Sequence, residues 1–254
     1  MPDIVANLDP SLLMLAALAF ALGGLVKGTV GLGLPTIAIA LLATFIGLRE
    51  AIAITIIPLV ATNLVQVIQV GSPLALVKRF GVLNATAAIG LWIGTEVLWA
   101  VDPRWLQIAL GCVLIFNAAL QFSRFALRIR QTREKVLSVP VGMVSGLVGG
   151  MTGSQGIVIA MYLSALDLTK DQYVQGVGLS FFLTGLVWMV AIGAQGAFTV
   201  SSLTASALGL VTALVAMAGG RAVRDRLPQE RFRQVVFVIL GLLGVNLIRR
   251  ALMG

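Results

Sequence analysis

The chain contains no histidine and a single cysteine, Cys112, among its 254 residues. The absence of histidine removes the commonest general base, proton shuttle and metal ligand. One cysteine provides neither an intrachain disulfide nor a metal cluster, and the apolar run around Cys112 is typical of a small core side chain. Because a clustered carboxylate set is also missing, the sequence argues against a catalytic site, a metal site, a cofactor and an enzymatic function.

Charge is scarce as well. Charged residues make up 11% of the chain, hydrophobic residues make up 59%, and the mean hydropathy is +1.02. Soluble globular domains contain about 25% charged residues, so this composition predicts an integral membrane protein. Apolar runs follow one another with short polar gaps, which predicts one membrane domain over residues 1–254. The N-terminal MPDIVANLDP lacks the basic region of a cleaved signal peptide, so we expect the first apolar stretch to be retained.

The net charge of +8 comes from basic residues that gather in the polar gaps. Ten of the 18 lysines and arginines lie in two gaps: Arg124, Arg128, Arg130, Arg133 and Lys135, then Arg221, Arg224, Arg226, Arg231 and Arg233. They do not form the basic patch expected of a nucleic-acid-binding protein. The positive-inside rule predicts that both gaps are cytoplasmic, in a multi-pass protein of the cytoplasmic (inner) membrane. Membrane lipid is therefore an expected partner, and nucleic acid is not.

Ten apolar segments are expected to be helical, which predicts an all-α, polytopic membrane protein. Their approximate bounds are 11–29, 33–47, 50–71, 80–100, 104–123, 136–149, 153–165, 171–193, 198–219 and 231–250. At 1.5 Å per residue, the short segments 136–149 and 153–165 reach only roughly 20 Å, whereas the hydrocarbon core is roughly 30 Å thick. We expect them to be broken or re-entrant.

The two halves of the chain resemble each other. GLVKGTVGLGLP in the first half and GMVSGLVGGMTGSQG in the second share one glycine spacing: Gly24, Gly28 and Gly31 against Gly142, Gly146 and Gly149. TIAIA at 36–40 then aligns with GIVIA at 156–160. The recurring order of five segments predicts repeat 1 at about 11–123, a basic cytoplasmic linker at 124–135 and repeat 2 at about 136–254.

The basic gaps also predict how the repeats are oriented. If 124–135 and 220–230 are both cytoplasmic, segments 136–149 and 153–165 must form a hairpin that enters and leaves on one side. Each repeat is then a broken or re-entrant helical hairpin plus three transmembrane helices, and two such repeats in tandem have inverted topology. Arg249 and Arg250 depart from the positive-inside rule, because this topology places them on the side of the membrane opposite the cytoplasm.

The glycine-rich breaks are the expected substrate site. Non-helical backbone at membrane depth is tolerated where protein or a water-filled cavity satisfies its polar groups, and the helix that starts after a break offers free N–H groups to an anion. The first break contributes Thr29, Gly31 and Gly33, and the second contributes Gly150, Thr152, Gly153, Ser154 and Gln155. Close helix packing is the alternative explanation for these glycines, and we prefer it for Gly24 and Gly28.

Lys27 precedes the first break and is a candidate counter-charge for an anion, because a charge at bilayer depth is expensive. The alternative is that segment 11–29 crosses fully and Lys27 extends to the far interface.

Further polar residues lie inside the predicted crossings. Asn63 and Gln66 share one face of segment 50–71, and Gln175 lies on the related segment of the second half, where these amides either bind substrate or hydrogen-bond between helices. Glu96 is the one acid in the interior of a crossing, so it is a candidate for proton coupling. The neighbouring Trp92 and Trp99 favour an interfacial position for it.

This pattern of GLVKGTVGLGLP, a basic central loop and VGMVSGLVGGMTGSQG resembles the TauE/SafE sulfite exporter family over nearly the whole chain. The resemblance implies movement of sulfite, organosulfonates or other small sulfur-containing anions. Members of that family often have a denser glycine run and a proline after each break. Here Pro35 preserves that feature in the first half only, and the second break, MTGSQG, is more polar.

We therefore expect a secondary transporter, in the exporting direction, for a small sulfur-containing anion, acting by alternating access between the repeats. A non-transporting membrane scaffold or accessory subunit is the alternative from another class, and an anion channel is a third. The sequence is compatible with a homo-oligomer and leaves the direction of transport and the coupling ion open.

Overall fold

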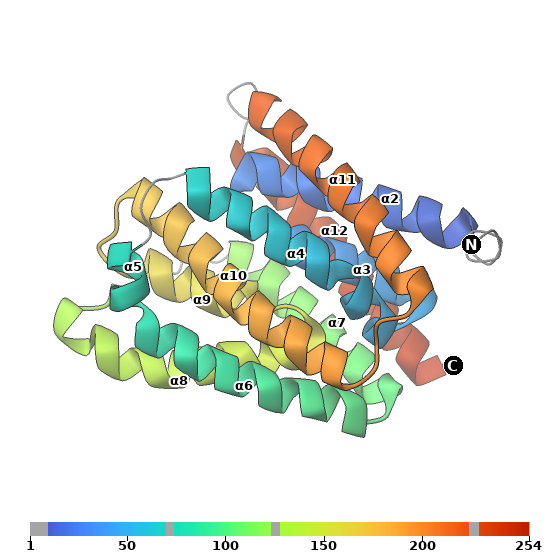
Figure 1. Ribbon diagram of the computed structural model, residues 1–254, viewed down its shortest axis with the longest axis horizontal. Helices are drawn as coiled ribbons and strands as arrows, with labels where there is room; N and C mark the ends of the chain where they lie inside the picture. The colour runs from blue at the N-terminus through green and yellow to red at the C-terminus, as the bar shows by residue number, and fades with distance from the viewer. Residues whose placement is uncertain (1–9, 70–73, 123–127, 224–228, 254) are drawn as a thin grey trace.

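The computed structural model describes residues 10–69, 74–122, 128–223 and 229–253, which are helical with short connections (Figure 1). The first half contains α2 (Pro10–Val30), α3 (Leu34–Ile46), α4 (Leu48–Gln69), α5 (Leu74–Arg79), α6 (Gly81–Ala100) and α7 (Pro103–Phe122). The second half contains α8 (Gln131–Thr152), α9 (Gly156–Ser164), α10 (Lys170–Ala194), α11 (Val200–Val223) and α12 (Gln229–Met253). These ranges include no β-strand, so the predicted all-α class is confirmed.

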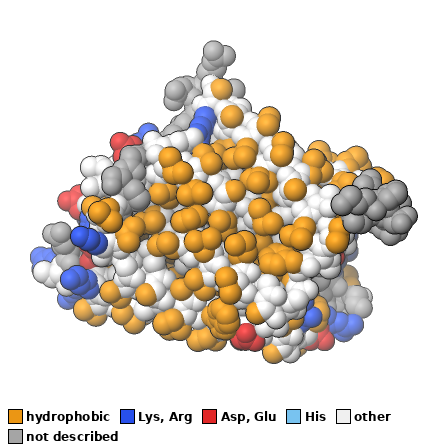
Figure 2. Space-filling view, viewed as in Figure 1, with side chains coloured by type: hydrophobic (Ala, Val, Ile, Leu, Met, Phe, Trp, Pro, Cys, Tyr) orange, Lys and Arg blue, Asp and Glu red, His pale blue; other side chains and the backbone are white. Residues whose placement is uncertain are grey.

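Among the described residues, eight helices are long and apolar enough to cross a membrane: α2, α4, α6, α7, α8, α10, α11 and α12. The helix α3 has 13 residues and α9 has 9, so both are shorter than a crossing. Hydrophobic side chains cover the middle of the face seen in Figure 2, and charged side chains gather toward its edges. The prediction of a polytopic membrane protein is thereby confirmed.

One expected length is wrong. Segment 136–149 is part of α8, which has 22 residues because it begins at Gln131 and continues to Thr152. A helix of that length is long enough to cross the hydrocarbon core. Hydropathy misses its first turn because residues 131–135 are polar, although Arg, Glu, Lys and Gln are good helix formers. The last five residues of the expected linker therefore belong to α8, and the short helix of the second hairpin is α9 alone.

Hydrogen bonds between distant segments define the two ends of the bundle. At the α5 end, Arg79 forms a bidentate pair with Glu134 at 2.8 and 2.9 Å, and the Ile129 amide donates to the Ala165 carbonyl. The bond to Glu134 raises the pKa of Arg79, so the guanidinium stays charged. At the opposite end, which we call the Arg49 end, the Arg49 guanidinium donates to three carbonyls at the end of α6 and in the following turn, those of Leu98, Trp99 and Val101.

The two hairpins open toward opposite ends of the bundle. The hairpin α2–α3 opens at the Arg49 end, where the Thr44 carbonyl accepts a bond from Arg250 and the N-terminal end of α2 lies (Figure 1). The hairpin α8–α9 opens at the α5 end, where the Tyr162 hydroxyl donates to the Glu134 carbonyl at 2.7 Å. The relation of the halves as inverted repeats, their boundaries and the expected linker stay predictions, which this arrangement supports.

Each half packs its long hairpin helix against a helix of the other half, α2 on α11 and α8 on α6, through glycines. A Cβ atom on Gly24 would lie 2.6 Å from the Ala213 carbonyl oxygen. A Cβ atom on Gly28 would overlap the Met217 carbonyl oxygen. In the other pair, a Cβ on Gly146 would overlap the Ala87 carbonyl oxygen. Such close backbone approach is the small-residue packing of membrane helices. The packing role preferred for Gly24 and Gly28 agrees with these contacts.

We expect Gly146→Ala to destabilise the protein by about 1–3 kcal/mol, because the added methyl group pushes α8 away from the backbone of α6. The matched control is Gly219→Ala in α11, where no atom lies within 4 Å of the added Cβ. That control should be neutral or stabilising by up to about 1 kcal/mol through helix propensity. Thermal unfolding of the purified protein in detergent compares the two variants. Equal midpoints would contradict the close contact.

Candidate functional site

Both hairpins turn through glycines with left-handed backbone. Gly31 and Gly33 have φ of 86° and 103°, and Gly153 has φ of 74°, a region that other L-residues rarely adopt. After these turns α3 begins with Gly33 as its N-cap and a proline in the first turn, and α9 begins with Gln155 as its N-cap. The sequence therefore ends each long helix inside the bundle and starts a short one there.

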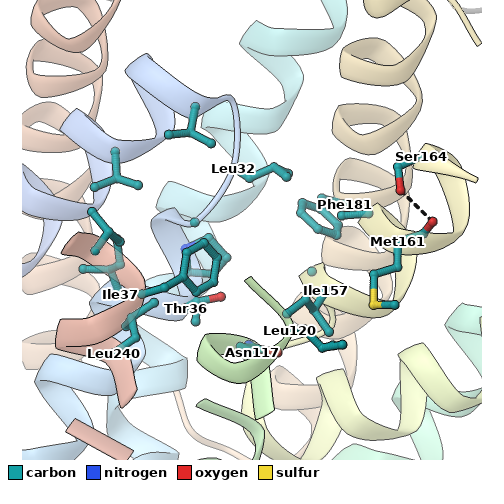
Figure 3. A pocket seen from close by; sticks show the side chains of 18 of the residues that line it. Leu32, Thr36, Ile37, Asn117, Leu120, Ile157, Met161, Ser164, Phe181 and Leu240 are labelled. Atoms are coloured by element: carbon teal, nitrogen blue, oxygen red, sulfur yellow. Dashed lines mark hydrogen bonds between the residues drawn. The ribbon is translucent and has the colours of Figure 1, made fainter. Parts of the chain in front are cut away.

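The first turns of α3 and α9 line one cavity of about 390 Å³ (Figure 3). Apolar side chains from six helices form most of its wall, including Val26, Ile37, Leu120, Ile157, Phe181 and Leu240. Its polar side chains are those of Thr36, Asn117, Ser164 and Tyr173. The free N–H groups at the start of a helix attract anions, so two such helix starts facing one cavity favour a small anionic ligand.

The tip of the second hairpin is held by buried polar contacts. Ser154 accepts a hydrogen bond from Asn117 at 3.3 Å, and the Gln155 amide nitrogen donates to Thr184 at 3.0 Å. The Thr184 hydroxyl proton is already donated to the Ser180 carbonyl at 2.6 Å, which fixes the orientation of the Gln155 amide. Two acceptor atoms at this tip, Oε1 of Gln155 and Oδ1 of Asn117, have no hydrogen-bond partner among the described residues. A buried acceptor without a hydrogen-bond partner is a site for water or a ligand.

The two hairpins touch at this tip. A Cβ atom on Gly153 would overlap the Ile39 side chain of α3 and lie 3.2 Å from the Trp188 ring of α10. Gly153 is therefore needed both for its backbone conformation and for the contact between the hairpins.

Lys27 is 3% exposed, and its ammonium group donates to Oδ1 of Asn63, which is fully buried on α4. The Asn63 amide nitrogen in turn donates to the Leu59 carbonyl at 2.8 Å, so its oxygen is committed to Lys27. Among the residues that the structure describes, the one salt bridge joins Arg79 and Glu134, and Lys27 has no carboxylate partner. A side chain this buried does not fit the alternative in which Lys27 extends to the interface.

Five other predicted site residues contact backbone groups of the protein. The Thr29 and Thr152 hydroxyls donate to carbonyls of their own helices, at 3.0 and 2.7 Å. Gln66 donates to the Val174 carbonyl at 2.8 Å and Gln175 to the Val67 carbonyl at 3.5 Å, which ties α4 to α10. Gly150 lies against the backbone of α6. These contacts agree with the packing and hydrogen-bonding alternatives, and the binding role of these five residues stays a prediction.

The predicted residues therefore fall into separate groups. Gly33 lines the cavity, Ser154 and Gln155 lie beside Asn117 at the second tip, Lys27 and Asn63 join α2 to α4, and Gly31 lies in the first turn with open space around it. Of the predicted set, Gly33 is the one residue in the described cavity wall.

Glu96 is exposed at the Arg49 end, where both carboxylate oxygens accept bonds from the Gln195 amide at 3.2 and 3.1 Å. The proton-coupling role requires a buried carboxyl, and the Glu96 carboxyl is exposed. Its position matches the interfacial alternative. The coupling role of Glu96 itself stays untested.

Sequence reasoning missed Asn117, Thr36 and Ser164. Asn117 carried a usable signal, because it is an isolated amide inside the apolar run GCVLIFNAAL of α7, where an unsatisfied amide is costly. Thr36 and Ser164 carried none, because threonine and serine are common in membrane helices and bond to their own backbone.

A protein-family model described as Sulfite exporter TauE/SafE matches residues 15–247. The chain belongs to the TauE/SafE family. No curated protein and no solved structure matches it. Family membership makes this TauE/SafE protein a multi-pass membrane protein of a transporter family associated with sulfite and related sulfur anions, which agrees with the eight apolar helices.

In this TauE/SafE protein, we expect Gly153→Ala to lower the stability more than Gly31→Ala. Both residues have positive φ, so both substitutions carry a backbone cost of about 1–2 kcal/mol. Only Gly153 is crowded, by Ile39 and Trp188, which adds about 1–3 kcal/mol, whereas Gly31 has no atom within 4 Å of an added Cβ. Thermal unfolding in detergent measures the difference. A Gly31→Ala variant as unstable as Gly153→Ala would contradict the crowded tip.

Proposed function

We propose that the protein is a secondary transporter that exports sulfite, an organosulfonate or a related small sulfur-containing anion across the cytoplasmic membrane by alternating access. The observation that carries this proposal is the burial of Lys27 without a carboxylate partner among the described residues, next to the tip of the first hairpin. A buried charge costs several kcal/mol in a low-dielectric site unless an opposite charge offsets it. A bound anion supplies that charge.

The position of Lys27 on α2 favours its use in the cavity. Val26 and Val30 both line the cavity, and Lys27 is adjacent to this face because successive helical residues are rotated by about 100°. The lysine side chain is long and flexible, so its ammonium group can move between Asn63 and the cavity without a change in the backbone. The cavity volume of 390 Å³ lies within the range of small-molecule sites, about 300–1,000 Å³.

Movement between the hairpins is the proposed route of alternating access. The cavity is bounded by the start of α3 from one hairpin and by α9 from the other, and the two hairpins open toward opposite ends. Transporters with such discontinuous helices place substrate between the halves and move one against the other. The α5 end contains Lys78, Arg79, Arg133 and Lys135, and the positive-inside rule favours it as the cytoplasmic end.

The first experiment measures sulfite and small sulfonate flux into proteoliposomes. Wild type should give saturable flux, and Lys27→Met should reduce it at least roughly tenfold, because 1.4 kcal/mol of lost anion stabilisation corresponds to a factor of ten. Lys135→Met, which removes an exposed lysine in the first turn of α8, is the control and should match wild type. Absence of flux for any small anion would favour the scaffold alternative, and non-saturating current would favour a channel.

A second experiment tests the cavity. We expect Ala160→Trp to block flux, because the indole fills the space between α9 and the start of α3. Val190→Trp on α10 is the control, since Val190 is 60% exposed on the outer face, and it should transport normally. Both variants should elute as folded protein. Normal flux through Ala160→Trp would place the substrate path elsewhere.

A further inference from the structure

The surroundings of Lys27 bear on the driving force, which the fold alone leaves open. Its helix, α2, packs against α3, α11 and α12, and Lys27 itself reaches Asn63 of α4. The helix α3 contains no charged residue. The described charged side chains of the other three are Arg221 of α11, which acts electrostatically on Lys27, and, toward the Arg49 end, Arg49, Glu50, Arg249 and Arg250. The charge that acts on Lys27 therefore has the same sign as the lysine ammonium.

This environment treats the two protonation states of Lys27 differently. The ammonium ion loses its hydration on burial and is repelled by Arg221, so it is costly when the site is empty. The neutral amine still has an N–H to donate to Asn63, so its hydrogen bond survives the loss of the proton. An anion beside Lys27 reverses the balance, because it attracts the ammonium ion and has no comparable interaction with the amine.

We propose that Lys27 carries the coupling proton: it is a neutral amine in the empty site and an ammonium ion when the anion is bound. The inference rests on the proposed transport function. One proton from the side of entry adds to the Lys27 nitrogen as the anion binds, and the same proton leaves the nitrogen on the other side as the anion departs. No bond other than this N–H forms or breaks, and nothing is oxidised or reduced.

Two consequences follow for transport. A monovalent anion crosses together with one proton, so the step moves no net charge, and the empty protein returns without an unpaired buried cation. The direction of net movement is then set by the product of the anion and proton gradients. Export occurs when the outward gradient of the anion exceeds the opposing proton gradient.

Glu134 and Glu96, two acids that the structure describes elsewhere, do not link proton uptake to anion binding in the same way. Glu134 is paired with Arg79 at the α5 end, and Glu96 is exposed at the Arg49 end. Neither lies in the cavity wall or beside Lys27. A proton taken up in step with anion binding is therefore assigned to Lys27.

The test is calorimetric binding of methanesulfonate, a permanently ionised anion, to purified full-length protein in buffers with different heats of protonation. Over a series of pH values, wild type should take up about one proton per anion on the alkaline side and fewer on the acidic side. Lys27→Arg should take up none at any pH, because a guanidinium stays charged. Lys135→Arg is the control and should behave as wild type. If methanesulfonate does not bind, sulfite replaces it, and the difference between wild type and Lys27→Arg isolates the proton on Lys27.

Proteoliposomes give a second readout. A pH gradient should drive methanesulfonate uphill in wild type, whereas Lys27→Arg should allow downhill flux without proton movement. Wild-type binding or saturable flux with no proton uptake would overturn the proton-carrying role while leaving the transport function intact. Unchanged proton uptake in Lys27→Arg would overturn it too. If wild type moves no anion at all, the proposed transport function itself fails, which is a distinguishable result.

Discussion

Backbone polar groups have no water to bond with in the hydrocarbon core, and this constraint governs where the chain is allowed to leave helical geometry. In the described part of the chain, two interruptions occur within hairpins, at 31–33 and at 153–155. Close packing of α2 on α11 and of α8 on α6 brings neighbouring backbones together through glycines. Residues 153–155 of the second tip are buried, and residues 31–33 of the first are partly buried. The helix starts of α3 and α9 are in turn available to a cavity and not to lipid.

The two halves use related positions for different chemistry. In the glycine alignment Lys27 corresponds to Ser145, since each precedes the second glycine of its set. Lys27 bridges α2 to α4 through Asn63, whereas Ser145 binds the Gln155 carbonyl and the Gln155 side chain reaches Thr184 on α10. The first half therefore contains an ionisable bridge and the second a bridge that stays neutral. When protonated, Lys27 offers one monovalent anion a partner, in line with the proposed cargo.

Several site residues were predictable because their signal is local. A lysine inside an apolar run is unusual wherever it lies, and left-handed turns demand glycine regardless of neighbours, so Lys27, Gly33 and Gly153 could be selected from sequence alone. Gln66, Gln175 and Gly150 were selected by the same reasoning, but their partners are backbone groups on neighbouring helices. A polar residue that binds substrate and one that ties two helices together look identical along the chain.

The sequence by itself determined that the chain lives in a membrane, where its helices break and which end of the bundle is basic, because hydropathy, glycine and loop charge act through local composition. The tertiary structure decided that α3 and α9 start at one cavity, that Asn117 joins the second tip, and that Lys27 meets an amide and no acid among the described residues. Those contacts join residues 36 or more positions apart, and their pairing depends on how whole helices pack. Only the folded bundle fixes which distant side chains meet.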